Sequence, residues 1–307
     1  MKWSISTHNC FRRCPRQYFF SNIMAFHNAK DPLRREAFML RQLKSIDEWR
    51  GSLVHSAIEL YLIKSLEGGI LISEKELLDK TITLAKAQFE FSHHQRYKDP
   101  NLKKKDAGSN FLALRDHEHG IPILQEKIDS LYKDIKQCYE FIYSNTRFIK
   151  FLQGADDYFP EKSIYFKFNG SNLSAQLDLA VPYSQNNSNK LCIIDWKISR
   201  VQTSDYSKQL YFYGFAALKD RQWRNYKAED LLLVEANLLQ GKFVKYTVSA
   251  ENLLQIEDFI YRSLLDIQFL TGERKYNLDD LEDYEYANSP MSCEYCKFER
   301  MCVRFAQ

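Results

Sequence analysis

Three short segments in the middle of the chain constrain its fold most, because their residues are either apolar throughout or alternate between apolar and polar. They cover residues 163–168, 173–181 and 191–196, and turn-forming residues separate them, first an Asn-Gly pair and then the stretch SQNNSNK. Short runs of this kind, bounded by turn residues, are typical of β-strands. We therefore predict three consecutive strands arranged as a meander.

Helical periodicity surrounds these strands, with apolar residues recurring every three or four positions. The predicted helices cover residues 51–66, about 74–91, about 121–152, 205–218 and 251–270. Two further strands are predicted at residues 231–239 and 242–248. The order of helix, three strands, helix and strand indicates an α/β fold.

The length and composition of the chain suit one large globular domain, because 45% of its 307 residues are hydrophobic and 27% are charged. We expect a single domain, 1–307, with a helical insertion at about 67–155 and a core at about 156–272. With 43 Lys and Arg against 40 Asp and Glu, a nucleic-acid partner would have to be bound by local basic patches. No segment resembles a signal peptide or a membrane span, so we expect a cytoplasmic protein without a membrane partner.

Two aspartates interrupt predicted buried strands, with Asp178 in AQLDLAV and Asp195 in CIIDWK. A buried carboxylate is costly without a partner, whereas two carboxylates together can bind a hard divalent cation such as Mg²⁺. Lys197 follows Asp195 by two residues, so the period of a strand places both on one face. This set suits phosphodiester hydrolysis, because the metal polarises the phosphate while Lys197 orients water or offsets charge. The alternative is a structural ion pair between Asp195 and Lys197, with Asp178 as an edge residue.

These residues resemble the RecB-like branch of the PD-(D/E)XK nucleases, which includes the AddB nuclease domain and the CRISPR-associated RecB-like nucleases. Asp178 matches the first acidic residue of that branch, and Asp195-Trp196-Lys197 matches its D/E-x-K element. The resemblance implies a restriction-endonuclease-like core, which is a mixed central sheet flanked by helices, and a Mg²⁺ or Mn²⁺ cofactor. It also implies that the backbone carbonyl of Trp196 is a metal ligand.

Two helical motifs extend the resemblance on either side of the strands. The segment Gly51-Ser-Leu-Val-His55 matches a Gly-x-x-x-His element, which makes His55 a metal ligand. The segment Gln209-Leu-Tyr-Phe-Tyr213 matches a Gln-x-x-x-Tyr element, which implies that Gln209 and Tyr213 contact DNA from one helix face. Glu161 begins the first strand, where such enzymes often carry an acidic residue. For each of these residues taken alone, the alternative interpretation is an ordinary role in packing or at the surface.

Four cysteines indicate a second metal centre. Cys293, Cys296 and Cys302 have the spacing C-x₂-C-x₅-C, and three thiolates need a fourth ligand to complete the site. The iron–sulfur members of the family take the fourth from a Cys-Pro segment, which corresponds here to Cys14. The resemblance thus implies a [4Fe–4S] cluster and a C-terminal clamp, in which segment 290–303 closes onto Cys14.

Two alternatives for this centre stay open. Zinc accepts the same four thiolates, so the residues alone do not distinguish it from an iron–sulfur cluster. Cys10 lies four residues before Cys14 and could share its helix face. Cys138 and Cys192 occur in apolar helix and strand contexts, which is typical of core residues.

Three classes of function are compatible with these motifs. The first is a metal-dependent deoxyribonuclease, exonuclease-like on single-stranded or frayed DNA ends, acting in repair, recombination, CRISPR adaptation or defence against foreign DNA. The second is a catalytically idle DNA-binding or scaffold subunit, and the third is a zinc-stabilised interaction protein. The intact Asp178, Asp195 and Lys197 favour the first. Because the sequence has no phosphate loop of the form G-x-x-x-x-G-K-[ST], we expect a protein partner to open or target the DNA.

Overall fold

The computed structural model describes residues 2–99, 101–102, 104–185, 188–200, 206–272 and 276–305. The chain forms two compact units. The sheet unit comprises Lys44–Phe166 and Ser174–Glu257, and the terminal unit comprises Met1–Leu43, Lys167–Leu173 and Asp258–Gln307.

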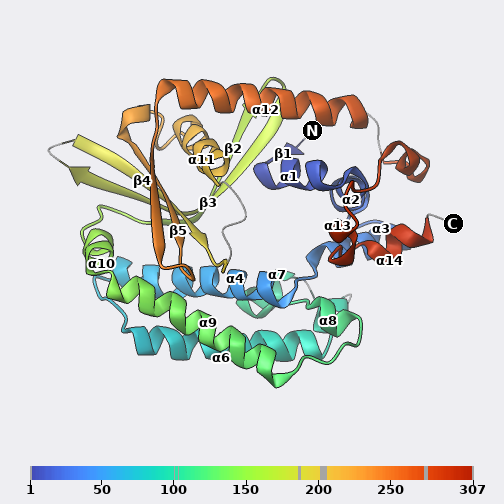
Figure 1. Ribbon diagram of the computed structural model, residues 1–307, viewed down its shortest axis with the longest axis horizontal. Coiled ribbons are helices and arrows are strands. Elements are labelled where there is room, and N and C mark those ends of the chain that lie inside the picture. Colours follow the sequence, from blue (N-terminus) through green and yellow to red (C-terminus); the bar gives the residue numbers. More distant parts are fainter. Residues whose placement is uncertain are drawn as a thin grey trace. The chain divides into compact units, whose positions relative to one another are not determined.

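A mixed sheet forms the centre of the sheet unit (Figure 1). Its strands, besides β1 (Lys2–Trp3), which pairs in parallel with Asn172 and Leu173 of β3, are β2 (Phe159–Phe168), β3 (Ser171–Gln185), β4 (Ser188–Lys197), β5 (Leu231–Asn237) and β6 (Lys242–Thr247). Strand β3 pairs with β2 and, in antiparallel orientation, with β4, so the predicted meander is confirmed. Strand β4 pairs in parallel with β5, and β5 pairs antiparallel with β6. Residues 191–196 of β4 are all buried, which explains their nearly unbroken apolar run.

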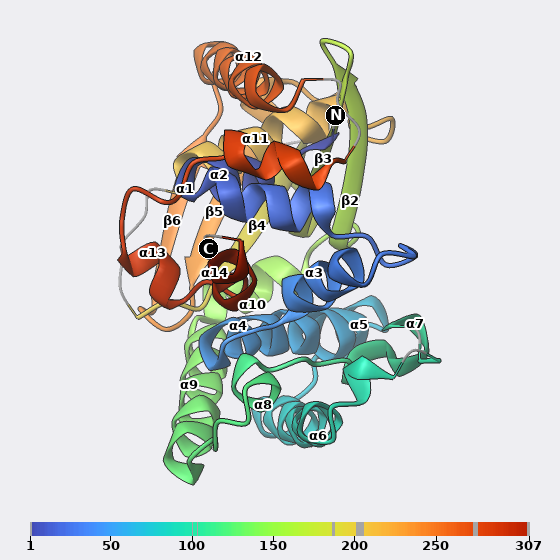
Figure 2. The ribbon, with the colours of Figure 1, turned by 90° about the vertical axis from the view of Figure 1, so that its right-hand side faces the viewer.

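Helices cover both faces of this sheet. Helix α11 (Ser207–Lys219) approaches one face at Gly214, where an added Cβ would lie 3.4 Å from side-chain carbons of Leu231 and Leu233. The other face shares one apolar core with a helical layer, and Figure 2 shows α4 and α6 of that layer. The layer contains α4 (Ile46–Ala57), α5 (Lys64–Glu67), α6 (Glu74–His93), α9 (Gln125–Ser144) and α10 (Thr146–Gln153), and the short helices α7 (Lys104–Ala107) and α8 (Arg115–Glu118) lie in the chain between α6 and α9.

Two helix boundaries have clear local causes. Helix α4 begins at a capping box, in which the side chain of Ser45 accepts from the backbone N–H of Glu48 and the Glu48 carboxylate accepts from that of Ser45. The single helix predicted at about 121–152 is wrong, because the chain forms α9 and α10 instead. Asn145 separates them, and its side chain caps α10 by accepting from the backbone N–H of Phe148 at 3.0 Å.

The terminal unit contains both ends of the described chain. Its elements include β1 (Lys2–Trp3), α1 (Ile5–Arg13), α2 (Pro15–Tyr18), α3 (Pro32–Gln42), most of α12 (Ala250–Thr271), α13 (Met291–Glu294) and α14 (Glu299–Arg304). The rings of Phe20 and Phe298 stack with their centroids 5.7 Å apart. The indole N–H of Trp3 donates to Oγ of Ser263 at 2.8 Å. Segments from opposite ends of the sequence therefore pack together in this unit.

Candidate functional site

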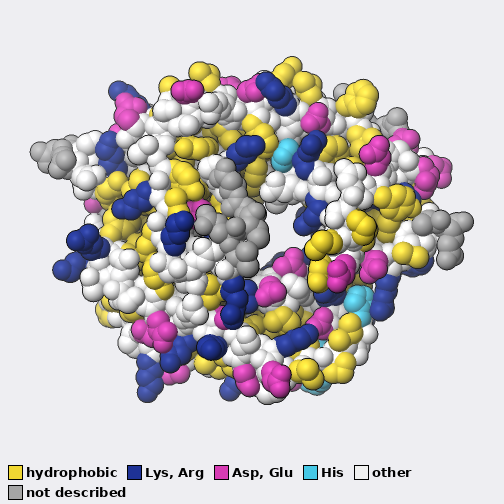
Figure 3. All heavy atoms as spheres, viewed as in Figure 1, with side chains coloured by type: hydrophobic (Ala, Val, Ile, Leu, Met, Phe, Trp, Pro, Cys, Tyr) yellow, Lys and Arg dark blue, Asp and Glu magenta, His cyan; other side chains and the backbone are white. Residues whose placement is uncertain are grey.

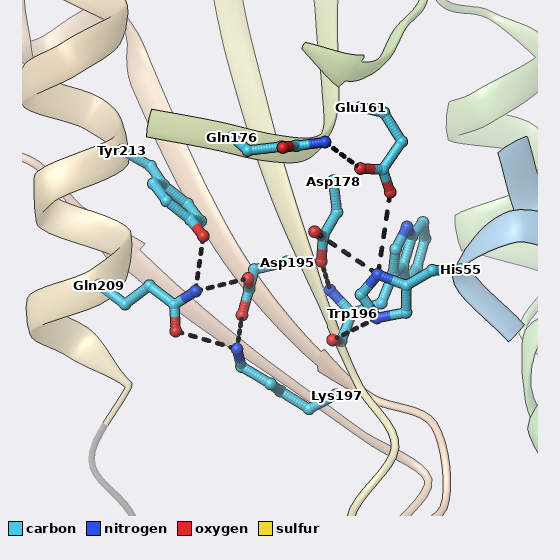
Figure 4. A network of polar contacts seen from close by, with 9 residues as sticks. All are labelled: His55, Glu161, Gln176, Asp178, Asp195, Trp196, Lys197, Gln209 and Tyr213. Atoms are coloured by element: carbon cyan, nitrogen blue, oxygen red, sulfur yellow. Dashed lines mark hydrogen bonds and ion pairs between the residues drawn. The ribbon is translucent and has the colours of Figure 1, made fainter. Parts of the chain in front are cut away.

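Elements of the sheet unit converge on one polar network (Figure 4). The residues are His55 from α4, Glu161 from β2, Gln176 and Asp178 from β3, Asp195, Trp196 and Lys197 from β4, and Gln209 and Tyr213 from α11. The structure thus brings together all the residues that the sequence motifs assign to the divalent-metal and DNA-contacting roles. Gln176 is an addition that no sequence motif marks.

His55, Glu161 and Asp178 form a group that can bind a divalent cation. One ligand atom from each lies within 4.8 Å of the others. Nδ1 of His55 is 3.6 Å from Oδ1 of Asp178 and 3.9 Å from Oε1 of Glu161. Carboxylate oxygens suit Mg²⁺ and Mn²⁺, and imidazole nitrogen binds many divalent metals. The donor set therefore fits the predicted cofactor.

The backbone of Trp196 fixes two of these side chains. Its N–H donates to Oδ2 of Asp178 at 2.8 Å, and its carbonyl oxygen lies 3.1 Å from Nε2 of His55. Donation from Nε2 to this carbonyl leaves the lone pair of Nδ1 directed at the two carboxylates, an arrangement common for metal-binding histidines. The carbonyl keeps a second lone pair, and its direct binding of metal stays a prediction.

A second part of the network surrounds Lys197. Its ammonium lies 2.5 Å from Oδ2 of the buried Asp195, donates to Oε1 of Gln209 at 3.0 Å, and lies 4.4 Å from the ring centroid of Tyr206. The amide nitrogen of Gln209 donates to Oδ1 of Asp195 at 3.3 Å and to the hydroxyl of Tyr213 at 2.6 Å. Gln209 therefore links the ammonium, the carboxylate and the phenol.

The predicted DNA-contacting pair lies on one face of α11, and that face is turned toward the carboxylates. Tyr213 is 6% exposed, and its hydroxyl accepts the hydrogen bond from Gln209. Contact of Gln209 and Tyr213 with DNA stays a prediction. Their hydrogen bonds give Gln209 a further role, which is to hold Lys197 beside Asp195.

The site holds more carboxylates than cationic side chains, and this excess of negative charge affects the pKa values of its residues. Burial raises the pKa of Asp195, and the charge of Asp178 adds to the rise, although Lys197 and His55 oppose it. Burial and the charge of Asp178 also raise the pKa of Glu161. Burial alone would lower the pKa of His55, but the hydrogen bond and charge of Asp178, with the charges of Glu161 and Asp195, raise it. The site therefore favours the uptake of positive charge, which a divalent cation would supply.

Glu161 has an unusual backbone conformation for a strand residue. Its φ is 46°, in the left-handed region that side chains other than glycine rarely adopt. Its carboxylate accepts a hydrogen bond from Nε2 of Gln176 at 2.7 Å. Backbone strain at functional sites persists when neighbouring contacts enforce it, so Gln176 helps to hold Glu161 against His55 and Asp178.

All seven cysteines are free thiols, and the four predicted cluster ligands, Cys14, Cys293, Cys296 and Cys302, all belong to the terminal unit. Burial raises the pKa of Cys296 to about 11, and the charges of Cys14, Cys302 and Cys293 contribute to the rise. Burial also raises the pKa of Cys302, and the charges of Cys14 and Cys293 add to that rise. A bound metal centre would lower these pKa values, because its ligands are thiolates, and a cluster at these four residues stays a prediction.

The predicted N-terminal member of this set is Cys14. Its sulfur accepts from the backbone N–H of Gln17 at 3.3 Å, at the start of α2. Cys10 contacts the hydroxyl of Ser21 at 3.6 Å, and burial raises its pKa with a contribution from the charge of Cys14, so Cys10 stays the alternative ligand. Cys138 and Cys192 are buried in the apolar core of the sheet unit, as predicted.

A metal-binding group beside an Asp–Lys pair is suited to metal-assisted hydrolysis of a phosphodiester. The family model of the PD-(D/E)XK nuclease superfamily matches residues 2–303, and the chain belongs to this superfamily. Among solved structures, the chain is similar to the one described as "Crystal structure of SSO0001", with 16% identity and a TM-score of 0.28 over 59% of this chain and 80% of that one. No curated protein matches the chain. In the described part of the chain, no helix combines the length and apolar character needed to cross a membrane.

Proposed function

We propose that this protein is a divalent-metal-dependent deoxyribonuclease, exonuclease-like at single-stranded or frayed DNA ends. One observation carries the proposal: the metal-binding group of His55, Glu161 and Asp178 shares a network with the Asp195–Lys197 pair. Membership of a nuclease superfamily whose enzymes use divalent metals supports it.

The residues of the site have distinct roles in hydrolysis. His55, Glu161 and Asp178 would hold Mg²⁺ or Mn²⁺, with Asp195 and the Trp196 carbonyl as further proposed ligands. The bound ion would polarise the phosphate and lower the pKa of water. Lys197 has its ammonium fixed by Asp195 and Gln209, which leaves one N–H for the attacking water or a phosphate oxygen. A donor held in place before the reaction needs little reorganisation as charge develops.

The same proposal includes a [4Fe–4S] cluster bound by Cys14, Cys293, Cys296 and Cys302, as in the RecB-like branch. The C-x₂-C-x₅-C spacing and the location of all four residues in the terminal unit support it. A cluster there would join the segment around Cys14 to segment 290–303 and stabilise the terminal unit. Zinc bound by the same thiols is the alternative for this centre. The free cysteines fit a reducing compartment, and we place the protein in the cytoplasm.

The wider setting of the enzyme is also part of the proposal. It would act on DNA ends or single strands in repair, recombination, CRISPR adaptation or defence, with a protein partner that opens or targets the DNA. The competing hypothesis is a catalytically idle DNA-binding or scaffold subunit. The Lys197–Asp195–Gln209 contacts favour the enzyme, because this network orients an ammonium group beside the metal-binding group.

A cleavage assay tests the proposal directly. Labelled single-stranded, duplex and flapped DNA are incubated with Mg²⁺ or Mn²⁺ and wild-type protein, Lys197→Ala or Lys86→Ala. Lys86 is an exposed lysine of α6 and serves as the matched control. We expect cleavage by the wild type and the control, and its loss in Lys197→Ala. A wild type that cuts none of the substrates, or a Lys197→Ala variant that cuts normally, would refute the proposal.

A further inference from the structure

A buried carboxylate outside the metal-binding group joins three parts of the sheet unit. Asp134 of α9 is 1% exposed. Its Oδ2 accepts from Nη1 of Arg50 of α4 at 2.9 Å, and its Oδ1 accepts from Nη2 of Arg200, which follows β4. Arg50 also donates from Nη2 to the carbonyl of Ile198 at 3.4 Å. A buried carboxylate needs such partners, so Asp134 holds both guanidinium groups in place.

Arg200 is the accessible member of this trio. Its side chain is 58% exposed, compared with 12% for Arg50. Asp134 engages Nη2 of Arg200, and within the described residues the guanidinium has no other polar contact. Because a guanidinium carries five N–H donors, most of them remain available to a ligand. Asp47 also contacts Arg50, at 2.8 Å, but Asp47 is 79% exposed and its charge is screened by solvent.

The position of Arg200 in the chain places it near the reacting bond. It follows Lys197 by three residues, and three residues of extended chain span at most about 11 Å. Each strand of duplex DNA carries one phosphate per roughly 3.4 Å of helix axis. A strand whose scissile phosphate lies at Lys197 therefore has its neighbouring phosphates within the range of Arg200.

We propose that Arg200, held by Asp134, binds a backbone phosphate of the substrate close to the scissile one. The proposal rests on the proposed nuclease function and adds a substrate-binding residue to it. The guanidinium fork matches two phosphate oxygens, and its fixed orientation reduces the entropy lost on binding. Contact with phosphate carries no base information, so Arg200 strengthens binding to all sequences alike.

DNA binding measured by fluorescence anisotropy tests this inference. A labelled single strand is titrated with Lys197→Ala protein, which we expect to bind DNA without cutting it, and with the same protein carrying Arg200→Ala. We expect Arg200→Ala to raise Kd roughly tenfold, as the loss of a charge-assisted hydrogen bond does. The slope of log Kd against log salt concentration should fall by about 0.7, the value for one phosphate contact on a single strand. Arg262→Ala is the matched control, since Arg262 is a 75% exposed arginine paired with Asp258 on α12.

Asp134→Asn separates orientation from net charge. It removes a negative charge, so electrostatics alone predicts tighter binding, whereas our proposal predicts weaker binding because Arg200 loses its anchor. If Asp134→Asn fails to fold, the comparison of Arg200→Ala with Arg262→Ala still tests the inference. Equal Kd and salt slope for Arg200→Ala and Arg262→Ala would overturn the inference while leaving cleavage by the wild type, and hence the proposed function, intact. If the wild type cuts nothing and the Lys197→Ala protein binds no DNA, both the inference about Arg200 and the proposed function are refuted.

Discussion

Replacing Gln209 with leucine distinguishes two roles for this residue, contact with DNA and orientation of Lys197. The amide of Gln209 accepts from the Lys197 ammonium at 3.0 Å and donates to the Asp195 carboxylate at 3.3 Å. Leucine has a similar volume and makes neither hydrogen bond. The substitution therefore keeps both Asp195 and Lys197 in the protein but removes the side chain that fixes their position relative to one another.

The size of the effect follows from the charges of its partners. A hydrogen bond to a charged group contributes about 1.5–3 kcal/mol, and water entering the site recovers part of that energy. Loss of a residue behind a metal-binding side chain typically costs roughly 10- to 100-fold in activity, or about 1.4–2.7 kcal/mol. We therefore expect kcat to fall by roughly 10- to 100-fold, with KM for DNA unchanged.

Steady-state cleavage of a labelled single strand in Mg²⁺ measures both constants. Gln255→Leu is the control, because Gln255 is an exposed glutamine of α12 whose amide contacts Glu251 at 3.2 Å. A rise in KM at constant kcat would show that Gln209 acts by contacting DNA, and would refute the orienting role.

Three further predictions concern the metal-binding group and the cysteines. Glu161→Gly should raise Tm, because it relieves backbone strain of about 1 kcal/mol. It should also weaken Mn²⁺ binding at least about tenfold, as measured by calorimetry. Mn²⁺ binding equal to that of the wild type would exclude Glu161 as a ligand. The metal-free protein should lose stability as pH rises from about 4 through neutrality, because Glu161, Asp195 and His55 have raised pKa values and keep their protons longer than the unfolded chain does. Mn²⁺ should offset that loss increasingly toward high pH in thermal melts, and a stability that rises with pH in the metal-free protein would contradict the assignment. Anaerobically purified protein should be brown, and Cys14→Ser or Cys296→Ser should abolish the colour while Cys10→Ser and Cys138→Ser keep it; a colourless wild type that binds zinc would favour the zinc alternative.

Sequence patterns were sufficient for the parts of the structure that depend on local order. The apolar runs around Asp178 and Asp195 predicted β3 and β4, and the two-residue period placed Asp195 and Lys197 together, where an ion pair at 2.5 Å joins them. The break between α9 and α10 was missed because apolar residues continue at helical spacing through Asn145, whose capping role depends on its conformation.

Other features of the site depend on contacts between distant parts of the chain. The orientation of Gln209 toward Asp195 is set by the packing of α11 on the sheet, which helical spacing alone does not specify. The positive φ of Glu161 has no signal in its residue type, since glutamate is not enriched there. Asp134 and Arg200 are 66 residues apart, so no local pattern relates them.

The contacts of Trp196 have a consequence for redesign of this protein. Its indole packs in the core, with its ring plane steeply inclined to that of Phe148 at a centroid separation of 5.9 Å, while its main-chain groups meet Asp178 and His55. Nearly every amino acid supplies the same main-chain N–H and carbonyl. Position 196 can therefore be varied among large apolar residues to adjust thermal stability while its two polar contacts are kept, and proline, which lacks the N–H, is the substitution that would remove the one to Asp178.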